Sequence, residues 1–382
     1  MKNKVAIVGF GYTVPKSKTP ELSYKELTFL AAQMAYKEAR IKPGEVDSFV
    51  AVSEDLHEGT SIFDEYVPDQ IGAVQKPVHT ISGDGIQGII SACLQIMTGM
   101  FDIIVVEGHS KASNILTPNY VMNYALDPVI NRPLGVNPYY IAGLEMRAYQ
   151  DSSGVTSDDI AKVVSYNKSR AVDNKLAPHG TKLTPARVLS AEPLFEPLGK
   201  QHLPAHSDAA YVIVLASNRI VKKKKSKPVW ISGMGYCSDS PTLESRDWTA
   251  GTSTRMAAEK AYKLAEITNP AEQIDVFEVD DSFGYKQLQN LEALGVLQKG
   301  GVGTLFQNGK GKNNLLSRIN PSGGTLGVGW MHEATGLHKT LEVYLQLKGA
   351  KGKNQIKGAK TGLAQCWRGI PTTTSAVIIL QK

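Results

Sequence analysis

A serine at a glycine-rich turn is the first residue of this chain that could carry chemistry. The stretch HTISGDGIQGIISACLQIM, residues 79–97, places Ser82 where the turn meets an apolar helix predicted over 86–97. Gly83 and Gly85 allow the backbone to bend at this point. The start of a helix offers free backbone N–H groups and the positive end of a dipole. We therefore expect Ser82 to be placed for chemistry, either as a nucleophile or as a capping or ligand-contacting group.

A pair of adjacent acids and a cysteine are the other candidates for chemistry. Asp280 and Asp281 follow a predicted strand, and two close carboxyl groups can hold different pKa values and so serve as acid and base. The alternative is structural, with one carboxylate capping the next helix and the other accepting a backbone N–H. Cys366, in the sequence CWRG, is predicted to lie in a loop, either as a reactive thiol or as a small pocket-lining residue.

The composition of the chain excludes several classes of protein. Its 382 residues carry 42 Lys and Arg against 36 Asp and Glu, a net charge of +6. We interpret the lysine-rich run at 222–227 as a solvated linker, because it lacks the interleaved aromatic residues of a nucleic-acid-binding patch. No apolar stretch approaches the roughly 20 residues that span a bilayer. The 3 cysteines are too few for a disulfide framework. We therefore expect a cytoplasmic protein that binds neither nucleic acid nor membrane.

The second part of the chain repeats the first. AAQMAYKEARI begins at Ala31 and AAEKAYKLAEI begins at Ala257, a spacing of 226 residues, and other similar pairs follow in the same order. An ordered set of matches at one spacing indicates a duplicated domain. We divide the chain into halves at 1–221 and 228–382, with 109–204 as an insertion and loop region of the first half. Each half alternates strands and helices, which predicts an α/β fold with helices packed on mixed sheets.

This duplicated pattern resembles the thiolase superfamily over essentially the whole chain, and most of all its archaeal and sterol-carrier-protein-x-like members, often labelled lipid-transfer proteins. The resemblance lies in GIQGI at 85–89, SDAA at 207–210, NPSGG at 320–324 with ATG at 334–336, and WRG at 367–369. It implies a five-layer αβαβα sandwich of two duplicated halves, a homodimer or dimer of dimers, and acyl-CoA as ligand with no further cofactor. Archaeal relatives are commonly accompanied by a small OB-fold and zinc-ribbon protein, so the resemblance also implies such a partner.

The family's catalytic residues are replaced in this sequence. The resemblance implies that Ser82 occupies the position of the family's nucleophilic cysteine. It also implies that Trp330 and Asp280 occupy the positions of two catalytic histidines. An indole N–H donates but cannot accept a proton, so we expect Trp330 to fill or reshape the pocket. His332, two residues on, could supply the missing base if the loop takes another route. Cys366 alone keeps a side chain that suits the family's chemistry at its position.

The resemblance also implies a set of substrate-binding residues near these positions. Arg368 could bind a phosphate or a carboxylate, or it could stack on Trp367. No metal site is expected, because Pro204 stands between His202 and His206 and argues against a regular helix there. The implied substrate-binding residues are Gly83, Ser322, Gly323, Gly324, Trp367 and Arg368.

We predict a thiolase-like protein that binds acyl-CoA and is nominally an acyltransferase of the acetyl-CoA acetyltransferase type. The replaced cysteine and histidines argue against ordinary thiolysis or Claisen condensation. One alternative is an aldolase that acts on a CoA ester, with Asp280 in the acid–base work. Another is a non-catalytic subunit of an acyl-CoA complex. Lipid carriage, which the family label suggests, is a third.

Overall fold

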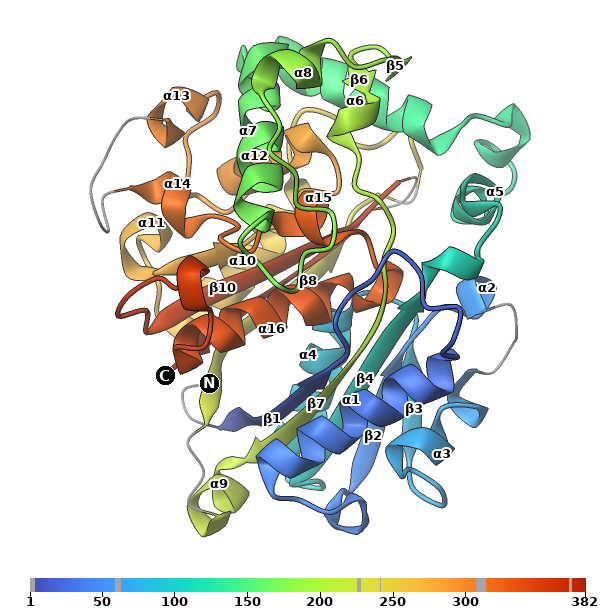
Figure 1. Ribbon diagram of the computed structural model, residues 1–382, viewed down its shortest axis with the longest axis vertical. Coiled ribbons are helices and arrows are strands. Elements are labelled where there is room, and N and C mark those ends of the chain that lie inside the picture. The colour runs from blue at the N-terminus through green and yellow to red at the C-terminus, as the bar shows by residue number, and fades with distance from the viewer. Residues whose placement is uncertain (1–3, 59–62, 225–227, 241, 307–313, 371–372) are drawn as a thin grey trace.

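In the computed structural model, nine strands of the described residues form one mixed sheet in the order β3-β2-β4-β7-β1-β8-β11-β10-β9 (Figure 1). The structure describes residues 4–58, 63–224, 228–240, 242–306, 314–370 and 373–382. The halves meet where β1 pairs antiparallel with β8. The first half contributes β1 (Val5–Tyr12), β2 (Ser48–Val52), β3 (Val78–Ile81), β4 (Ile103–Lys111) and β7 (Asp208–Ser217). The second half contributes β8 (Val229–Ser238), β9 (Val276–Glu278), β10 (Thr361–Arg368) and β11 (Thr374–Gln381).

Two helices lie between the two halves of this sheet. α4 (Gly85–Met97) and α16 (Thr335–Lys348) share one hydrophobic core with inward-facing residues from the strands of both halves. The outer face of the first half is covered by α1 (Tyr24–Ala39) and that of the second by α10 (Thr252–Ala265), behind which lies α12 (Gly284–Ala293). The layers therefore alternate helix, sheet, helix, sheet and helix, which confirms the predicted α/β sandwich.

The internal repeat corresponds to one packing contact made twice. Gly11 of β1 lies so close to α1 that a β-carbon there would sit 1.8 Å from the carbonyl oxygen of Ala31. In the second half, a β-carbon at Gly235 of β8 would sit 2.2 Å from the carbonyl oxygen of Ala257 in α10. Only glycine allows this approach, and the alanines of the repeated motif keep the facing helix surface flat. The residues that the two halves have in common therefore maintain the contact between this helix and its strand.

The segment between β4 and β7 adds a group of helices at one end of the sheet (Figure 1). Its main helix is α6 (Pro138–Ser153). The start of this helix follows from local signals: the Asn137 side chain accepts the Tyr139 N–H, and a proline occupies the first turn. The other elements here are α5 (Pro118–Asn123), α7 (Ser157–Ala171), α8 (Pro185–Leu189) and the small hairpin of β5 (Pro193–Phe195) and β6 (Leu198–Gly199).

The lysine-rich run begins inside a helix rather than in a linker. Its first three lysines end α9 (Asn218–Lys224), as suits a good helix former, and residues 225–227 lie outside the described residues. The division of the chain at 221 and 228 stays a prediction. Among the described residues, no helix has the length and apolar character to cross a membrane. The remaining short helices are α2 (Asp55–Glu58), α3 (Pro68–Ile71), α11 (Pro270–Gln273), α13 (Val302–Leu305), α14 (Leu315–Arg318) and α15 (Gly324–Val328).

The contact between β1 and α1 can be tested by adding one methyl group. We expect Gly11→Ala to lower the free energy of unfolding by about 2–3 kcal/mol, because the new β-carbon would overlap the Ala31 carbonyl oxygen. The measurement is the urea concentration at the midpoint of unfolding. Gly44→Ala is the control, since a β-carbon there meets nothing within 4 Å, and it should change stability by less than about 0.5 kcal/mol. Equal effects of the two substitutions would contradict the packing argument.

Candidate active site

A cavity of about 180 Å³ opens where α4 begins and β10 ends. Its walls come from both halves of the chain, so neither half could form it alone. One part of the wall is apolar and the other carries acids, histidines and a thiol. The apolar or aromatic lining includes Val121, Met122, Tyr139, Leu203, Phe283, Trp367 and Ile370. The polar lining includes Glu54, His57, Asp84, His206, His332, Glu333, Cys366 and Arg368.

The carboxyl group at the head of α4 belongs to Asp84, which is 3 % exposed and lines the cavity. Asp84 is the N-cap of the helix: its Oδ1 accepts the N–H of Ile86 at 2.8 Å, and its own N–H donates to Gln87 Oε1 at 2.8 Å. Its Oδ2 accepts the N–H of Gly336, in the first turn of α16, at 3.0 Å. One carboxylate therefore joins the two central helices.

Burial raises the pKa of Asp84 to about 6, because the apolar surroundings disfavour the charged form. The donors on its oxygens act in the opposite direction, led by the Cys366 thiol and followed by the N–H groups of Ile86 and Gly336. The nearby Asp280 adds a smaller upward shift. A carboxyl group with this pKa is ionised at neutral pH and is more basic than an exposed aspartate, which suits it to proton transfer.

The thiol of Cys366 lies against this carboxylate. Cys366 Sγ donates to Asp84 Oδ2 at 2.9 Å and lies 3.8 Å from Asp280 Oδ2. Burial, together with these two negative charges, raises the pKa of Cys366 well above its usual value, so the group is a neutral thiol at physiological pH. The sequence-based placement in a loop was wrong. Cys366 lies within β10, because the segment TGLAQCWR pairs with β11 along its whole length and with β9 near its start.

Ser82 is not at the helix terminus. It lies two residues before the N-cap, its side chain is exposed, and it is not among the residues that line the cavity. Its carbonyl oxygen accepts a hydrogen bond from Arg368 Nη1 at 3.3 Å. The expectation that Ser82 caps the helix was therefore wrong, because the cap is Asp84, two residues later. Its role as a nucleophile or ligand contact stays a prediction. The available signal was the sequence D-x-x-Q, with Asp84 and Gln87 spaced as in a capping box.

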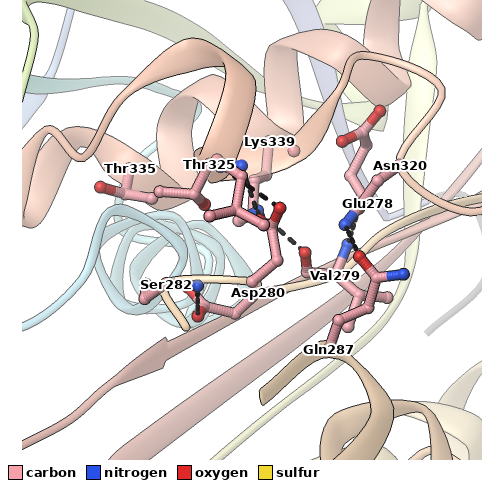
Figure 2. Close-up of polar contacts among 12 residues, drawn as sticks. Glu278, Val279, Asp280, Ser282, Gln287, Asn320, Thr325, Thr335 and Lys339 are labelled. Carbon is pink, nitrogen blue, oxygen red and sulfur yellow. Dashed lines mark hydrogen bonds and ion pairs between the residues drawn. The ribbon is translucent and has the colours of Figure 1, made fainter. Parts of the chain in front are cut away.

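The paired acids that follow β9 are buried, and Figure 2 shows Asp280 among its polar neighbours. Asp280 Oδ1 accepts the N–H of Ser282 at 2.9 Å, and burial raises its pKa. Asp281 accepts the N–H of Thr325 at 2.6 Å and lies 3.4 Å from Lys339 Nζ. Lys339, which is also buried, donates to the carbonyl oxygen of Val279 at 3.0 Å. These contacts match the structural alternative for Asp281, while Asp280 reaches the cavity only through Cys366.

The loop before α16 places two ring systems in the cavity wall. Trp330 lines the cavity, and its backbone N–H donates to the carbonyl oxygen of Ala205 at 2.7 Å. The ring of His332 lies 4.5 Å from the Trp330 ring and is 7 % exposed. Burial, and the nearby His57 and His206, lower the pKa of His332 well below its usual value, so it is neutral. The rings that pack against His332 are those of His57, His206 and Trp330.

The implied substrate-binding residues divide into two groups. Gly83, Trp367 and Arg368 line the cavity. Ser322, Gly323 and Gly324 are not part of this lining, and their role in substrate binding stays a prediction. Ser322 Oγ donates to Glu278 Oε2 at 2.7 Å, and the two glycines take left-handed backbone angles that start α15. They turn the chain behind the cavity, where the backbone conformation requires glycine.

Ion pairs at the rim of the cavity were not predicted from the sequence. His57 Nδ1 lies 2.9 Å from Glu333 Oε1, and Arg368 pairs with Glu54. Burial opposes the charged form of His57, but the Glu333 carboxylate outweighs it and raises the His57 pKa. The partners are far apart in the sequence, so no spacing or motif could indicate them.

The buried thiols can be tested by alkylation. We expect iodoacetamide at neutral pH to modify Cys237 alone in the native protein, because Cys93 and Cys366 are buried and burial raises the pKa of both thiols. Intact mass should show a single adduct, no adduct in Cys237→Ser, and full modification after unfolding in urea. Rapid native labelling of Cys366 would show that its thiolate is accessible.

Comparisons with known proteins agree with this fold. Residues 235–382 match the thiolase C-terminal domain-like family. The chain is 26% identical to the acetyl-CoA acetyltransferase of Methanothermobacter thermautotrophicus, over 94% of each protein. It is also 26% identical to sterol carrier protein 2 of Bos taurus, over 95% of this chain and 70% of that protein. The solved Ltp2-ChsH2(DUF35) aldolase has the same fold, with a TM-score of 0.81 at 20% identity over 99% of this chain and 98% of that one. These similarities support a place for the chain in the thiolase superfamily, beside sterol carrier protein 2.

Proposed function

We propose that this protein makes or breaks a carbon–carbon bond beside an acyl thioester by proton transfer, as an aldolase does. The observation that carries the proposal is Asp84: a carboxyl group in the cavity wall, with a pKa of about 6, held by the N–H of Gly336 and the thiol of Cys366. A base of this kind can act at neutral pH without a covalent intermediate.

The contacts of the possible nucleophiles argue against acyl transfer. A serine or cysteine must lose its proton to attack a thioester, and it needs a neighbouring base or a lowered pKa to do so. Ser82 lies outside the cavity lining, and the pKa of Cys366 is raised. Trp330, at the position of the family's histidine, has no lone pair with which to accept a proton. Cys366 serves instead as a hydrogen-bond donor to Asp84.

The proposed reaction is a retro-aldol cleavage of a 3-hydroxyacyl thioester, or its reverse. The Asp84 carboxylate removes the proton of the 3-hydroxyl group, and the bond between the second and third carbons breaks. The third carbon becomes an aldehyde or ketone, and the electron pair forms the enolate of the shortened thioester. That enolate takes up a proton at its second carbon, so proton number is conserved over the reaction. The apolar wall with Met122, Leu203 and Phe283 offers space for the hydrocarbon part of the substrate.

Two features of the proposal concern ligand and partner. We propose acyl-CoA as the thioester, in keeping with the acetyl-CoA acetyltransferases among the relatives. We also propose a small companion protein, since the aldolase of the same fold is named together with a DUF35 protein. A homodimer and a cytoplasmic location stay predictions from the sequence.

Acyl transfer is the second candidate function, because two relatives that match 90% or more of this chain are named acetyl-CoA acetyltransferase. The two candidates differ in what acetyl-CoA should do. An acyltransferase of this superfamily would leave an acyl group on a serine or cysteine, visible in the intact mass. The aldolase proposal expects no adduct.

The role of Asp84 can be tested with a 3-hydroxyacyl-CoA, using the protein with whatever co-purifies with it from its native cell. We expect Asp84→Asn to lower kcat/KM for release of the carbonyl product by about 100-fold or more, because the amide cannot accept the proton. Ser82→Ala is the matched control in the same turn and should retain the activity of the unsubstituted protein. Loss of activity in the serine variant, with retention in the aspartate variant, would favour acyl transfer.

The pH dependence gives a separate test. Asp84 acts in its ionised form, so kcat/KM should rise with pH through about 6 and then level off. The Cys366 thiol stabilises the carboxylate and lowers the Asp84 pKa. Cys366→Ala should therefore move the rising limb to higher pH, while Cys366→Ser, which keeps a donor, should move it less. A limb that does not move in Cys366→Ala would contradict the assignment to Asp84.

A further inference from the structure

Three side chains with metal-ligating atoms meet at the rim of the cavity. His57 lies in α2, whereas His332 and Glu333 lie in the short 3₁₀ helix His332–Ala334 before α16. One ligand atom from each residue lies within 4.8 Å of those of the other two. All three residues line the cavity.

The imidazole of His332 is buried without a hydrogen-bond partner. It is 7 % exposed, and among the residues that the structure describes neither of its ring nitrogens has a partner. A buried polar group left unpaired costs about 1–3 kcal/mol, so the arrangement calls for a partner. His332 also takes a left-handed backbone angle, with φ of 48°, which is uncommon for a residue other than glycine. This conformation and the packing against Trp330 hold the ring in the cavity wall.

The other two residues complete an arrangement that a cation would fit. His57 Nδ1 lies 2.9 Å from Glu333 Oε1, and the rings of His57 and His332 lie 4.3 Å apart between centroids. Neighbouring ligands of one transition-metal ion are separated by roughly 3–4 Å when each bond is about 2.1 Å. A small closing movement therefore brings all three atoms onto one ion.

We propose that His57, His332 and Glu333 bind a divalent transition-metal ion. Two imidazoles and one carboxylate suit Zn²⁺, Co²⁺, Ni²⁺ or Fe²⁺, whereas Mg²⁺ and Ca²⁺ prefer oxygen ligands alone.

The charges around this cluster are compatible with a cation. Arg368 lies 3.6 Å from Glu333 Oε1 and also pairs with Glu54. Two carboxylates therefore face one guanidinium group, and a metal ion would replace the proton that Glu333 favours on His57. His206, on the other side of His332, lies 5.7 Å away between ring centroids and carries a lowered pKa through burial, so it adds no competing positive charge.

A metal ion here would share the cavity with Asp84 and could polarise a carbonyl oxygen of the substrate. That use rests on the proposed function. Binding of the metal does not, and the test below measures binding alone.

The test is a titration of the chelator-treated, full-length protein with Co²⁺, followed by visible absorption and calorimetry. We expect one equivalent to bind, with the intense visible bands of a histidine-coordinated ion. His57→Ala, Glu333→Gln and His332→Asn should each weaken binding by about 100-fold or more, since even loss of a residue that only supports a ligand costs 10–100-fold. Asparagine is chosen at His332 because it tolerates the left-handed backbone better than most residues.

His206→Ala is the matched control, since it removes a histidine from the same cavity that is not in the cluster. It should leave the affinity for Co²⁺ unchanged, and circular dichroism should show all four variants folded. The proposal would be overturned if Co²⁺ gave only the weak spectrum of the hydrated ion. It would also be overturned if the three ligand variants bound Co²⁺ as tightly as the control. If Co²⁺ binds as expected while Asp84→Asn keeps full activity, the metal site stands and the aldolase proposal fails.

Discussion

The Asp84 carboxylate is the interaction on which the rest of the structure depends. It caps its own helix through Ile86, accepts the first-turn N–H of α16 at Gly336, and accepts the thiol of Cys366 in β10. The first half of the chain is thereby joined to two elements of the second half at one buried point. Gly336 is required there, because a β-carbon would lie 1.9 Å from Asp84 Oδ1. Any change in how the halves pack would alter this carboxyl group first.

The same contact explains why the site favours proton transfer over acyl transfer. Desolvation raises the pKa of Asp84 to about 6, and the negative charge of that carboxylate helps to raise the pKa of Cys366. The negative charge of an ionised Asp84 therefore disfavours ionisation of Cys366, so the cysteine stays a neutral thiol rather than a thiolate. Behind them, the buried cation of Lys339 lies among carboxylates, and it lowers the pKa of Asp280 against the larger effect of burial. The polar network behind the cavity keeps these buried charges balanced.

The duplication accounts for the packing contact that the two halves share, while the residues around the cavity differ between the halves. In each half, a glycine on the first strand receives an alanine-lined helix, as at Gly11 with Ala31 and at Gly235 with Ala257. These contacts lie on the outer faces of the sheet. The cavity lies between the halves instead, and the loops and helix ends that form it differ from one half to the other. Residues such as Trp330 and His57 could therefore change the chemistry without disturbing the repeated packing.

The sequence by itself determined the duplicated α/β sandwich and the apolar helix that follows the glycine-rich turn, and its short motifs carried the resemblance to the thiolase superfamily. The sandwich and the helix follow from local periodicity and from a repeat that runs along the chain. Only the tertiary structure decided which side chains share the cavity. The residue at the start of the helix is Asp84 and not Ser82, because the capping box lies two residues later than the glycine-rich turn suggested. It also brought Cys366 to Asp84 and His57 to Glu333 across more than 270 residues. Contacts at such separation are set by how the halves pack, which no local pattern of residues records.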